Sequence, residues 1–286
     1  MSGREAHAAF GVTSMTAPLR RVLVRRPAVA GDWERAGWRV PDPVVLARQH
    51  DAFCALLAGL GAEVEVAPAL DGLVDAVYMH DPLLVTARGG IPLRMRKPAR
   101  AAEPGHARAE LERLGVPVLG ELPEGAFADG GDRFWLDDET MAIGLGYRTN
   151  HAGADAVAAL SGVAVEAYDL PHDQGPAHVL HLQSLISAIT PELCVVYEPL
   201  APVRLLEDLA ERGVRRIAID RESYDAMGCN VLAVRPGVVV MVDGAPAVRR
   251  TLERHGVEVH VYDGSELSLK GDGGPTCLTA PLLRRA

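Results

Sequence analysis

The sequence predicts a single α/β domain, and two observations lead to that prediction. Short apolar runs rich in β-branched residues recur along the 286-residue chain, bounded by Gly, Pro or Asp as strands are. Stretches with apolar residues at helical spacing lie between some of them. No Ser/Gly-rich linker divides the sequence. We therefore expect one domain over residues 1–286, with about residues 1–18 as a mobile N-terminal segment.

The predicted strands share β-branched composition and polar or turn-forming boundaries. In order along the chain, they are 21–25, 64–66, 83–86, 133–136, 163–168, 193–197, 216–219, 230–234, 238–242 and 257–261. The predicted strands 230–234 and 238–242 are joined by Arg235-Pro236-Gly237, which predicts a hairpin. Such strand pairs show that the pattern is not a strict βαβ alternation.

The predicted helices are 43–60, 106–114, 152–160, 202–212 and 245–255. The first is the best marked, because Pro43 stands at its start and Gly61 follows its end. Cys54 lies on the apolar stripe of this helix with Leu46 and Leu57, so we expect it in the core. No Gly-x-Gly-x-x-Gly or Walker loop is present, which weighs against nucleotide binding.

Charge and cysteine spacing exclude several classes of function. The net charge of −9 argues against a phosphate-binding surface, so we expect no nucleic acid partner. The four cysteines, Cys54, Cys194, Cys229 and Cys277, form no zinc-type cluster and suggest a reducing compartment. Neither a signal-peptide core at residues 1–16 nor a long apolar run is seen, so we expect a cytoplasmic protein without membrane contact. The sequence leaves a homo-oligomer open.

The segment Gly271-Asp-Gly-Gly-Pro-Thr-Cys277-Leu-Thr279 is the most informative part of the chain. Glycines allow a backbone to approach a ligand closely, so the segment could present the Cys277 thiol at the floor of a pocket. Together with a histidine and an acid, that thiol would be a nucleophile. A turn around a buried, inert cysteine suits the same residues equally well.

Two acidic segments could supply the acid that would act together with the Cys277 thiol. Ala128-Asp129-Gly-Gly-Asp132 has the composition of a type I′ or II′ hairpin turn, the reading we favour for it alone, but it could also place a carboxylate in a pocket. In Asp75-Ala-Val-Tyr-Met-His80-Asp81-Pro82, a strand would put Asp75, Val77 and Met79 on one face and end at Pro82. Acids at a strand end suit a pocket, although N-cap or turn aspartates would look the same.

Basic and histidine residues complete the candidates. One arginine of the segment 94–103 could bind a carboxylate in bidentate fashion, and Arg148-Thr149-Asn150 offers another. His178 and His181 are three residues apart, but a metal site would need a further ligand that the spacing does not supply. A general base requires only one of them near a thiol.

The order of these motifs resembles the guanidine-modifying family of dimethylarginine dimethylaminohydrolases, arginine deiminases and amidinotransferases. It is most similar to the dimethylarginine dimethylaminohydrolase branch, and the resemblance covers about residues 21–281. The matching motifs are Asp81-Pro82, Arg100-x-x-Glu103, Asp129-x-Gly-Asp132, Arg148-Thr-Asn150, His181-Leu182 and Gly-Gly-Pro-Thr-Cys277.

The resemblance implies a five-bladed, pseudo-symmetric α/β propeller (pentein) of ββαβ units, with the site on the central axis. It also implies Cys277 as nucleophile, His181 as general acid/base and Asp129 as the acidic partner of the histidine. No metal or organic cofactor is implied. The residues implied in binding are Asp81 at the guanidinium with Asp75 beside it, Arg100 and Arg148 at the amino-acid end of the substrate, and Trp33 in a mobile loop over the pocket.

The implied activity is hydrolysis of a small guanidino compound, arginine or N-methylated arginine. Cys277 would form a covalent S-alkylthiouronium, and a citrulline-type ureido product plus amine or ammonia would result. A nearby cation, the substrate or the His181 imidazolium, would lower the pKa of the thiol.

Three departures from the family pattern keep alternatives open. Asp129 stands where the hydrolases carry Glu and amidinotransferases carry Asp, so transfer of the amidino group to an amine acceptor remains an alternative. His80 replaces an acid, and Gln183 stands where arginine deiminases tend to have Asp, which leaves the substrate open. A non-catalytic arginine-binding homologue would share the same pocket residues.

Overall fold

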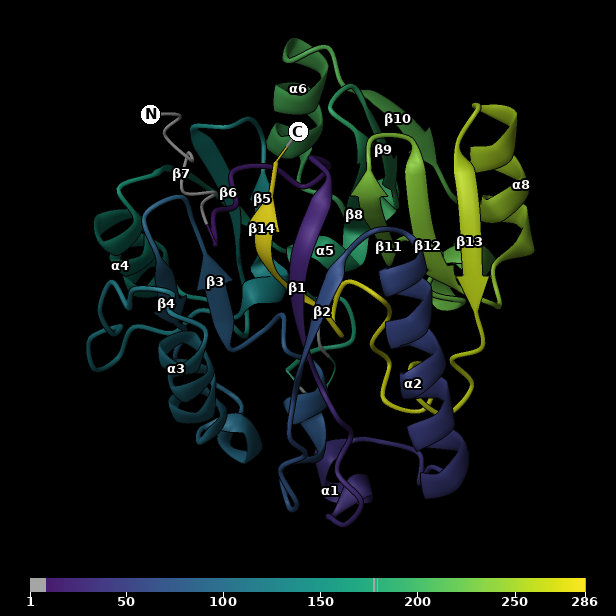
Figure 1. Cartoon of the computed structure of the whole chain (residues 1–286). Helices are drawn as coiled ribbons and strands as arrows, with labels where there is room; N and C mark the ends of the chain where they lie inside the picture. Colours follow the sequence, from purple (N-terminus) through teal and green to yellow (C-terminus); the bar gives the residue numbers. More distant parts are fainter. Residues whose placement is uncertain (1–8, 177, 179, 286) are drawn as a thin grey trace, which may run out of the picture.

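The computed structural model describes residues 9–176, 178 and 180–285, and in this part of the chain the strands form five small sheets (Figure 1). The sheet orders are β14-β1-β2, β3-β4, β5-β6-β7, β8-β9-β10 and β11-β12-β13. The strands are β1 (Leu19–Arg25), β2 (Glu63–Ala67), β3 (Leu83–Val85), β4 (Gly90–Pro92), β5 (Arg133–Trp135), β6 (Thr140–Leu145), β7 (Ala164–Asp169), β8 (Ile186–Thr190), β9 (Leu193–Val196), β10 (Arg215–Ala218), β11 (Val231–Arg235), β12 (Val238–Val242), β13 (Glu258–Tyr262) and β14 (Ala280–Arg284).

One arrangement recurs in the three-stranded sheets. The central strand is antiparallel to one neighbour and parallel to the other, as β6 is to β5 and β7. A helix connects each parallel pair, because a parallel return needs a crossover. In the β3-β4 sheet the third place is held by a single parallel bridge, Gly90 to Val118. The helices are α1 (Trp33–Ala36), α2 (Pro43–Gly59), α3 (Glu103–Arg113), α4 (His151–Ser161), α5 (Leu182–Leu185), α6 (Val203–Glu211), α7 (Arg221–Asp225) and α8 (Pro246–Arg254).

The ten predicted strands and five predicted helices each correspond to an observed element, and the predicted hairpin is the antiparallel pair β11-β12. Four strands were not predicted: β4, β6, β8 and β14. Two of them contain proline and all four contain glycine or alanine, residues that weaken a local strand signal. The proposed strand over 75–79 is wrong, because Val74–Val77 forms a 3₁₀ turn instead.

The core lies between the sheets and the outer helices. Figure 1 shows α2, α3, α4, α6 and α8 on the outside of the molecule, with the strands inside them. Successive side chains of β1 point to opposite faces of its sheet. Val22 and Val24 pack in the cluster that contains α2, whereas Leu23 packs in the cluster that contains α3. Helix α2 begins where the Asp42 side chain accepts hydrogen bonds from the backbone N–H groups of the first turn.

The chain ends meet at the β14-β1-β2 sheet. Gly11 N donates to Leu282 O at 2.8 Å, and Val12 is buried against β14 and its neighbours. Residues 1–8 of the segment that was predicted to be mobile lie outside the described residues. Residues 10–16 of the same segment contact the core. No helix in the described ranges is long and apolar enough to cross a membrane.

Candidate active site

A cavity of about 250 Å³ brings together most of the predicted site residues. Cys277 and His181 both line it, as the proposed chemistry requires. Asp75, Asp81, Arg100 and Arg148 line it as well. Asp129 and Trp33 are not part of its wall in the described chain.

The loop that carries Cys277 connects β13 to β14, and its glycines are required by close contacts rather than by a left-handed backbone. A Cβ on Gly273 would lie 2.3 Å from the Tyr78 ring, and one on Gly274 would lie 2.5 Å from the Asn230 side chain. Asn230 Nδ2 donates to Cys277 Sγ at 3.2 Å, and Asn230 Oδ1 accepts from Thr276 N at 3.1 Å. Asn230 thus fixes both the loop and the sulfur, a role for which its sequence context gave no signal.

The Cys277 thiol is half-buried, and its electrostatic setting is opposite to the expected one. Burial and the nearby Asp81 carboxylate raise the pKa of Cys277 to about 12. The Asn230 hydrogen bond acts in the other direction but does not outweigh them. In the ligand-free site these effects oppose the expected lowering of the thiol pKa, and the lowering by a bound cation stays a prediction.

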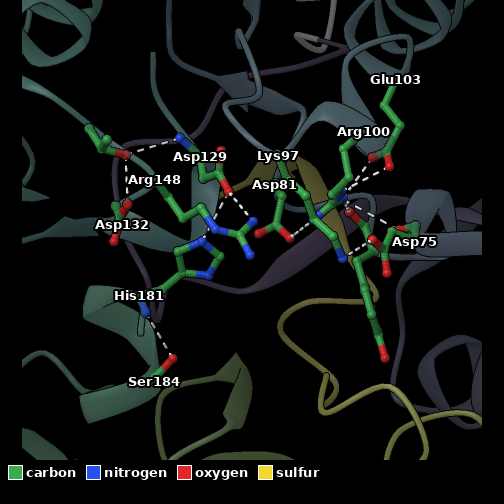
Figure 2. A network of polar contacts seen from close by, with 12 residues as sticks. Asp75, Asp81, Lys97, Arg100, Glu103, Asp129, Asp132, Arg148, His181 and Ser184 are labelled. Atoms are coloured by element: carbon green, nitrogen blue, oxygen red, sulfur yellow. Dashed lines mark hydrogen bonds and ion pairs between the residues drawn. The ribbon is translucent and has the colours of Figure 1, made fainter. Parts of the chain in front are cut away.

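His181 is the residue that precedes helix α5, and it is held at both its backbone and its ring. Its backbone N donates to Ser184 Oγ at 3.2 Å, and Nε2 lies 3.1 Å from Asp129 Oδ2 (Figure 2). Burial alone would lower the pKa of His181, but the Asp132 charge and the Asp129 hydrogen bond outweigh it and raise that pKa. A Cβ on Gly131 would lie 2.4 Å from His181 Nδ1, so only glycine leaves room for the ring.

The acidic loop is a short 3₁₀ turn, Gly130–Asp132, so the hairpin-turn interpretation is wrong. Asp132 accepts from Thr149 Oγ1 at 2.6 Å and from Leu182 N at 3.0 Å, which ties the Arg148 loop to the His181 helix. Asn150 caps helix α4 by accepting from Gly153 N at 2.9 Å. Of Arg148-Thr149-Asn150, two residues therefore build the loop and only Arg148 reaches the cavity.

Asp129 lies behind the cavity wall. Its Oδ2 faces His181 Nε2 and lies 3.5 Å from Arg148 Nη1, while its Oδ1 has no hydrogen-bond partner among the described residues. The position agrees with the predicted partnership with His181. Because position 129 carries Asp rather than the Glu of the hydrolases, its side chain is one methylene shorter and its carboxylate reaches less far from the backbone.

Asp81 is anchored by one oxygen and open at the other. Arg100 Nη1 donates to Asp81 Oδ2 at 2.5 Å, and the remaining edge of Arg100 pairs with Glu103 at 2.7 and 2.9 Å (Figure 2). Asp81 Oδ1 is buried and has no partner among the described residues. Burial alone would raise the pKa of Asp81, but the Arg100 charge outweighs it and lowers that pKa to about 2.

These contacts give Arg100 a role other than the expected one. Its donors already face Asp81, Glu103 and backbone carbonyls, and its side chain is buried. We describe Arg100 as a positioning residue for Asp81. That it also holds the amino-acid end of a substrate stays a prediction.

Asp75 has both oxygens occupied. Trp38 Nε1 donates to Oδ1 at 2.8 Å, and Lys97 Nζ donates to Oδ2 at 2.6 Å. Lys97 Nζ also donates to Ala36 O at 2.6 Å. Trp33 packs edge-on against Trp38, with ring centroids 5.2 Å apart, so Trp38 is the tryptophan that contacts a cavity-lining residue. Lys97 belongs to the basic segment, but nothing in the sequence distinguished it from its neighbours.

His80 connects the Cys277 loop to helix α5. Its backbone N donates to Cys277 O at 3.1 Å, its Nδ1 contacts Thr279 O at 3.0 Å, and its Nε2 contacts Gln183 Nε2 at 2.8 Å. Burial and the Arg133 charge lower the pKa of His80 to about 3, so the ring is neutral. A neutral ring can donate from Nδ1 and accept at Nε2, which satisfies both contacts.

The other three cysteines lie outside the cavity wall. Cys194 and Cys229 are buried, and Cys54 is half-buried rather than buried as expected. Burial raises the pKa of Cys54 to about 11 and that of Cys194 to about 12. Within the described residues, no group of three or more His, Cys, Asp or Glu side chains could hold a metal ion.

Comparison with protein families gives an arginine deiminase match over residues 207–284. An arginine deiminase of Rhodococcus erythropolis is 30% identical over 189 residues, which cover 54% of this chain and 46% of that protein. An arginine deiminase of Clostridium perfringens is 25% identical over 262 residues, covering 75% of this chain and 62% of that protein. The chain thus spans about half to two thirds of the length of these relatives.

Solved structures share the fold over more of the chain. Dimethylarginine dimethylaminohydrolase from Pseudomonas aeruginosa, in complex with citrulline, matches with a TM-score of 0.77 at 22% identity, covering 92% of this chain and 98% of that one. The N-terminal domain of ArgZ, a cyanobacterial arginine dihydrolase bound to its product, matches with a TM-score of 0.81 at 18% identity, covering 93% and 98%. In sequence the chain is thus similar to arginine deiminases, and it shares the fold of dimethylarginine dimethylaminohydrolase and of the N-terminal domain of ArgZ.

Proposed function

We propose that the protein is a cysteine-dependent hydrolase of a small guanidino compound. One observation carries the proposal: Cys277 and His181 line the same cavity as Asp81, whose buried Oδ1 has no hydrogen-bond partner among the described residues. A buried, unpaired carboxylate oxygen is unfavourable, and a guanidinium N–H is a suitable donor to it. Asp81 would therefore hold the cation with its reacting carbon near the sulfur.

The first half of the reaction uses His181 as base and then as acid. The bound guanidinium places a positive charge beside the sulfur and so opposes the effect of Asp81 on the thiol pKa. The raised pKa of His181 strengthens it as the base that takes the Sγ proton. The Cys277 thiolate then forms a C–S bond with the guanidinium carbon, the C–N bond to the departing amine breaks, and the His181 imidazolium gives its proton to that amine.

The second half releases the product. Water attacks the carbon of the S-alkylthiouronium while His181 accepts a proton from it. The C–S bond breaks, the thiolate leaves, and a ureido product results. Acid–base help of this kind is typically worth about 10²–10⁴-fold in rate. Asp129 supports it by hydrogen bonding to the ring of His181.

The fold supports the same proposal. We propose that the five sheets are the blades of a five-bladed α/β propeller with ββαβ units, as the resemblance implies. The repeated order of a strand pair, a helix and a parallel strand is consistent with it, and the cavity collects loops that follow strands of different sheets.

The test is an assay for ureido product with L-arginine, N-methylated arginine, agmatine and guanidino acids. Turnover of at least one compound is expected, and Cys277→Ser should reduce it below detection. Cys54→Ser, a change of the same kind at a cysteine outside the cavity, should leave turnover unaffected. Turnover that survives Cys277→Ser would show that another group is the nucleophile.

Two alternatives give different results in the same assay. An amidinotransferase would release more than one equivalent of amine per site only when an amine acceptor such as glycine is present, and it would form no ureido product. A binding protein would bind guanidino compounds without turning them over under any of these conditions.

A further inference from the structure

We propose that Lys97 occupies the ammonium-binding position of the cavity, so that the site takes guanidino carboxylic acids without an α-ammonium group in preference to arginine. This inference rests on the proposed function, because it names the substrate class of the same site. The observation behind it is the pair of contacts made by Lys97 Nζ, 2.6 Å to Asp75 Oδ2 and 2.6 Å to Ala36 O.

These two acceptors are what a substrate ammonium would need. A carboxylate oxygen and a backbone carbonyl both accept charge-assisted hydrogen bonds from an –NH₃⁺ group. The second Asp75 oxygen is also occupied, because Trp38 Nε1 donates to it at 2.8 Å. Lys97 and Asp75 both line the cavity (Figure 2), so an entering ammonium would have to displace Lys97 to reach Asp75.

Among the described residues of the cavity wall, no other aspartate offers an unpaired charge to an ammonium. Asp81 is paired with Arg100 at 2.5 Å and keeps only its Oδ1 open, which the proposed function assigns to the guanidinium. Asp272 lies at the exposed rim and pairs with Arg39 at 3.3 Å. A substrate with two cationic groups would therefore find one acceptor open and one filled.

The same wall carries cations that suit a carboxylate. Arg148 lines the cavity, and its one side-chain polar contact among the described residues is the long 3.5 Å approach to Asp129. Its remaining N–H donors can bind a carboxylate in bidentate fashion. Lys97 adds a second positive charge to the same cavity. A chain with a guanidinium at one end and a carboxylate at the other complements Asp81, Arg148 and Lys97.

The test compares L-arginine with 5-guanidinopentanoic acid, which differs from it only by lacking the α-ammonium group. Binding is measured by calorimetry on Cys277→Ser, and kcat/KM for ureido product is measured on the unaltered protein. We expect 5-guanidinopentanoic acid to be favoured by at least about tenfold, which corresponds to about 1.4 kcal/mol. Equal or better binding of arginine would overturn the inference.

Lys97→Met provides the matched change, because it removes the ammonium and keeps an unbranched apolar side chain. Arginine should then bind more tightly, 5-guanidinopentanoic acid more weakly, and the ratio should move toward arginine by at least about tenfold. Lys270→Met is the control, since Lys270 is not part of the cavity wall and Nζ contacts Val40 O at 3.5 Å. An unchanged ratio in Lys97→Met would overturn the inference.

The two measurements separate the inference from the proposed function. Preferred binding of 5-guanidinopentanoic acid without ureido product would support the inference and contradict the hydrolase. Ureido product with arginine preferred would support the hydrolase and contradict the inference. Failure of both ligands to bind would contradict both.

Discussion

Asp75 and Asp81 stand six residues apart, line one cavity and are each paired with a basic side chain, yet the structure uses them differently. Both oxygens of Asp75 accept hydrogen bonds from inside the protein. Asp81 gives one oxygen to Arg100 and keeps the other without a partner among the described residues.

The difference teaches that a carboxylate in a cavity is available to a ligand only through the oxygen that the protein leaves open. Arg100 is held on its far side by Glu103, so it can pair with Asp81 through a single N–H. Lys97 lines the cavity together with Asp75 and donates to its Oδ2 at 2.6 Å. The resemblance implies that both aspartates contact the substrate, whereas among the described residues only Asp81 keeps a carboxylate oxygen without a partner.

The largest effect that separates the two pairs is expected in stability. Arg100→Met leaves Asp81 and Glu103 buried without a cation and should lower the free energy of unfolding by about 3–5 kcal/mol. Lys97→Met acts on a pair that is partly open to solvent and should cost about 1 kcal/mol or less. Urea unfolding of both variants measures the difference, and equal losses would show that the pairs are equivalent.

Acid stability should also distinguish the pairs. The pKa of Asp81 is about 2 in the folded protein, below the usual 3.8, so its contribution is present above pH 3.8 and is lost as the pH falls toward 2. The shift corresponds to about 2 kcal/mol. Urea unfolding between pH 5 and pH 2 measures the loss of stability on acidification. The part of that loss that comes from Asp81 should be absent in Asp81→Asn and present in Asp75→Asn. Its absence from both variants would contradict the assignment of the low pKa to Asp81.

Asp129 differs from both Asp75 and Asp81, because it lies behind the cavity wall and would act through His181. Asp129→Asn removes a charge and weakens the hydrogen bond that helps to raise the His181 pKa, so that pKa should fall. Since the amine departs with the His181 proton, the alkaline limb of kcat should move to lower pH. The pH–rate profile and the NMR titration of the ring measure this. The exposed Asp155→Asn should leave both unchanged, and an unmoved limb in Asp129→Asn would count against the pairing.

The smallest predicted effect concerns the reactivity of the thiol. Cys277 should be alkylated by iodoacetamide only slowly at neutral pH, because its pKa is raised to about 12. Asp81→Asn removes one cause and should increase the rate at a given pH, whereas Asp75→Asn should have little effect. Mass spectrometry reports each site, with Cys194 as an internal control. Rapid alkylation of Cys277 near pH 7 in the unaltered protein would contradict a raised thiol pKa.

Much of the fold could be predicted from the sequence because strands and helices carry their own periodicity. Helix α2 shows this clearly, with Asp42 and Pro43 at its start and Gly61 after its end. Strand β4 (Gly90–Pro92) has no such signal, because it is defined by its pairing with β3 rather than by its own residues.

The candidate site was predictable to the extent that it depends on motif order. Cys277, His181 and Asp81 do meet at one cavity. What could not be predicted is how side chains share partners: whether Lys97 reaches Asp75, or whether Trp38 rather than Trp33 does, depends on loops brought together by the fold. Asn230 lies 47 residues before the sulfur that it contacts, and no motif marks it.

The position of the His181 ring limits which residues can replace Gly131 in evolution. With the ring 2.4 Å from where a side chain at position 131 would begin, even alanine would displace the imidazole while leaving most of the fold untouched. A related protein with a residue larger than glycine at that place would have to hold its imidazole in a different position.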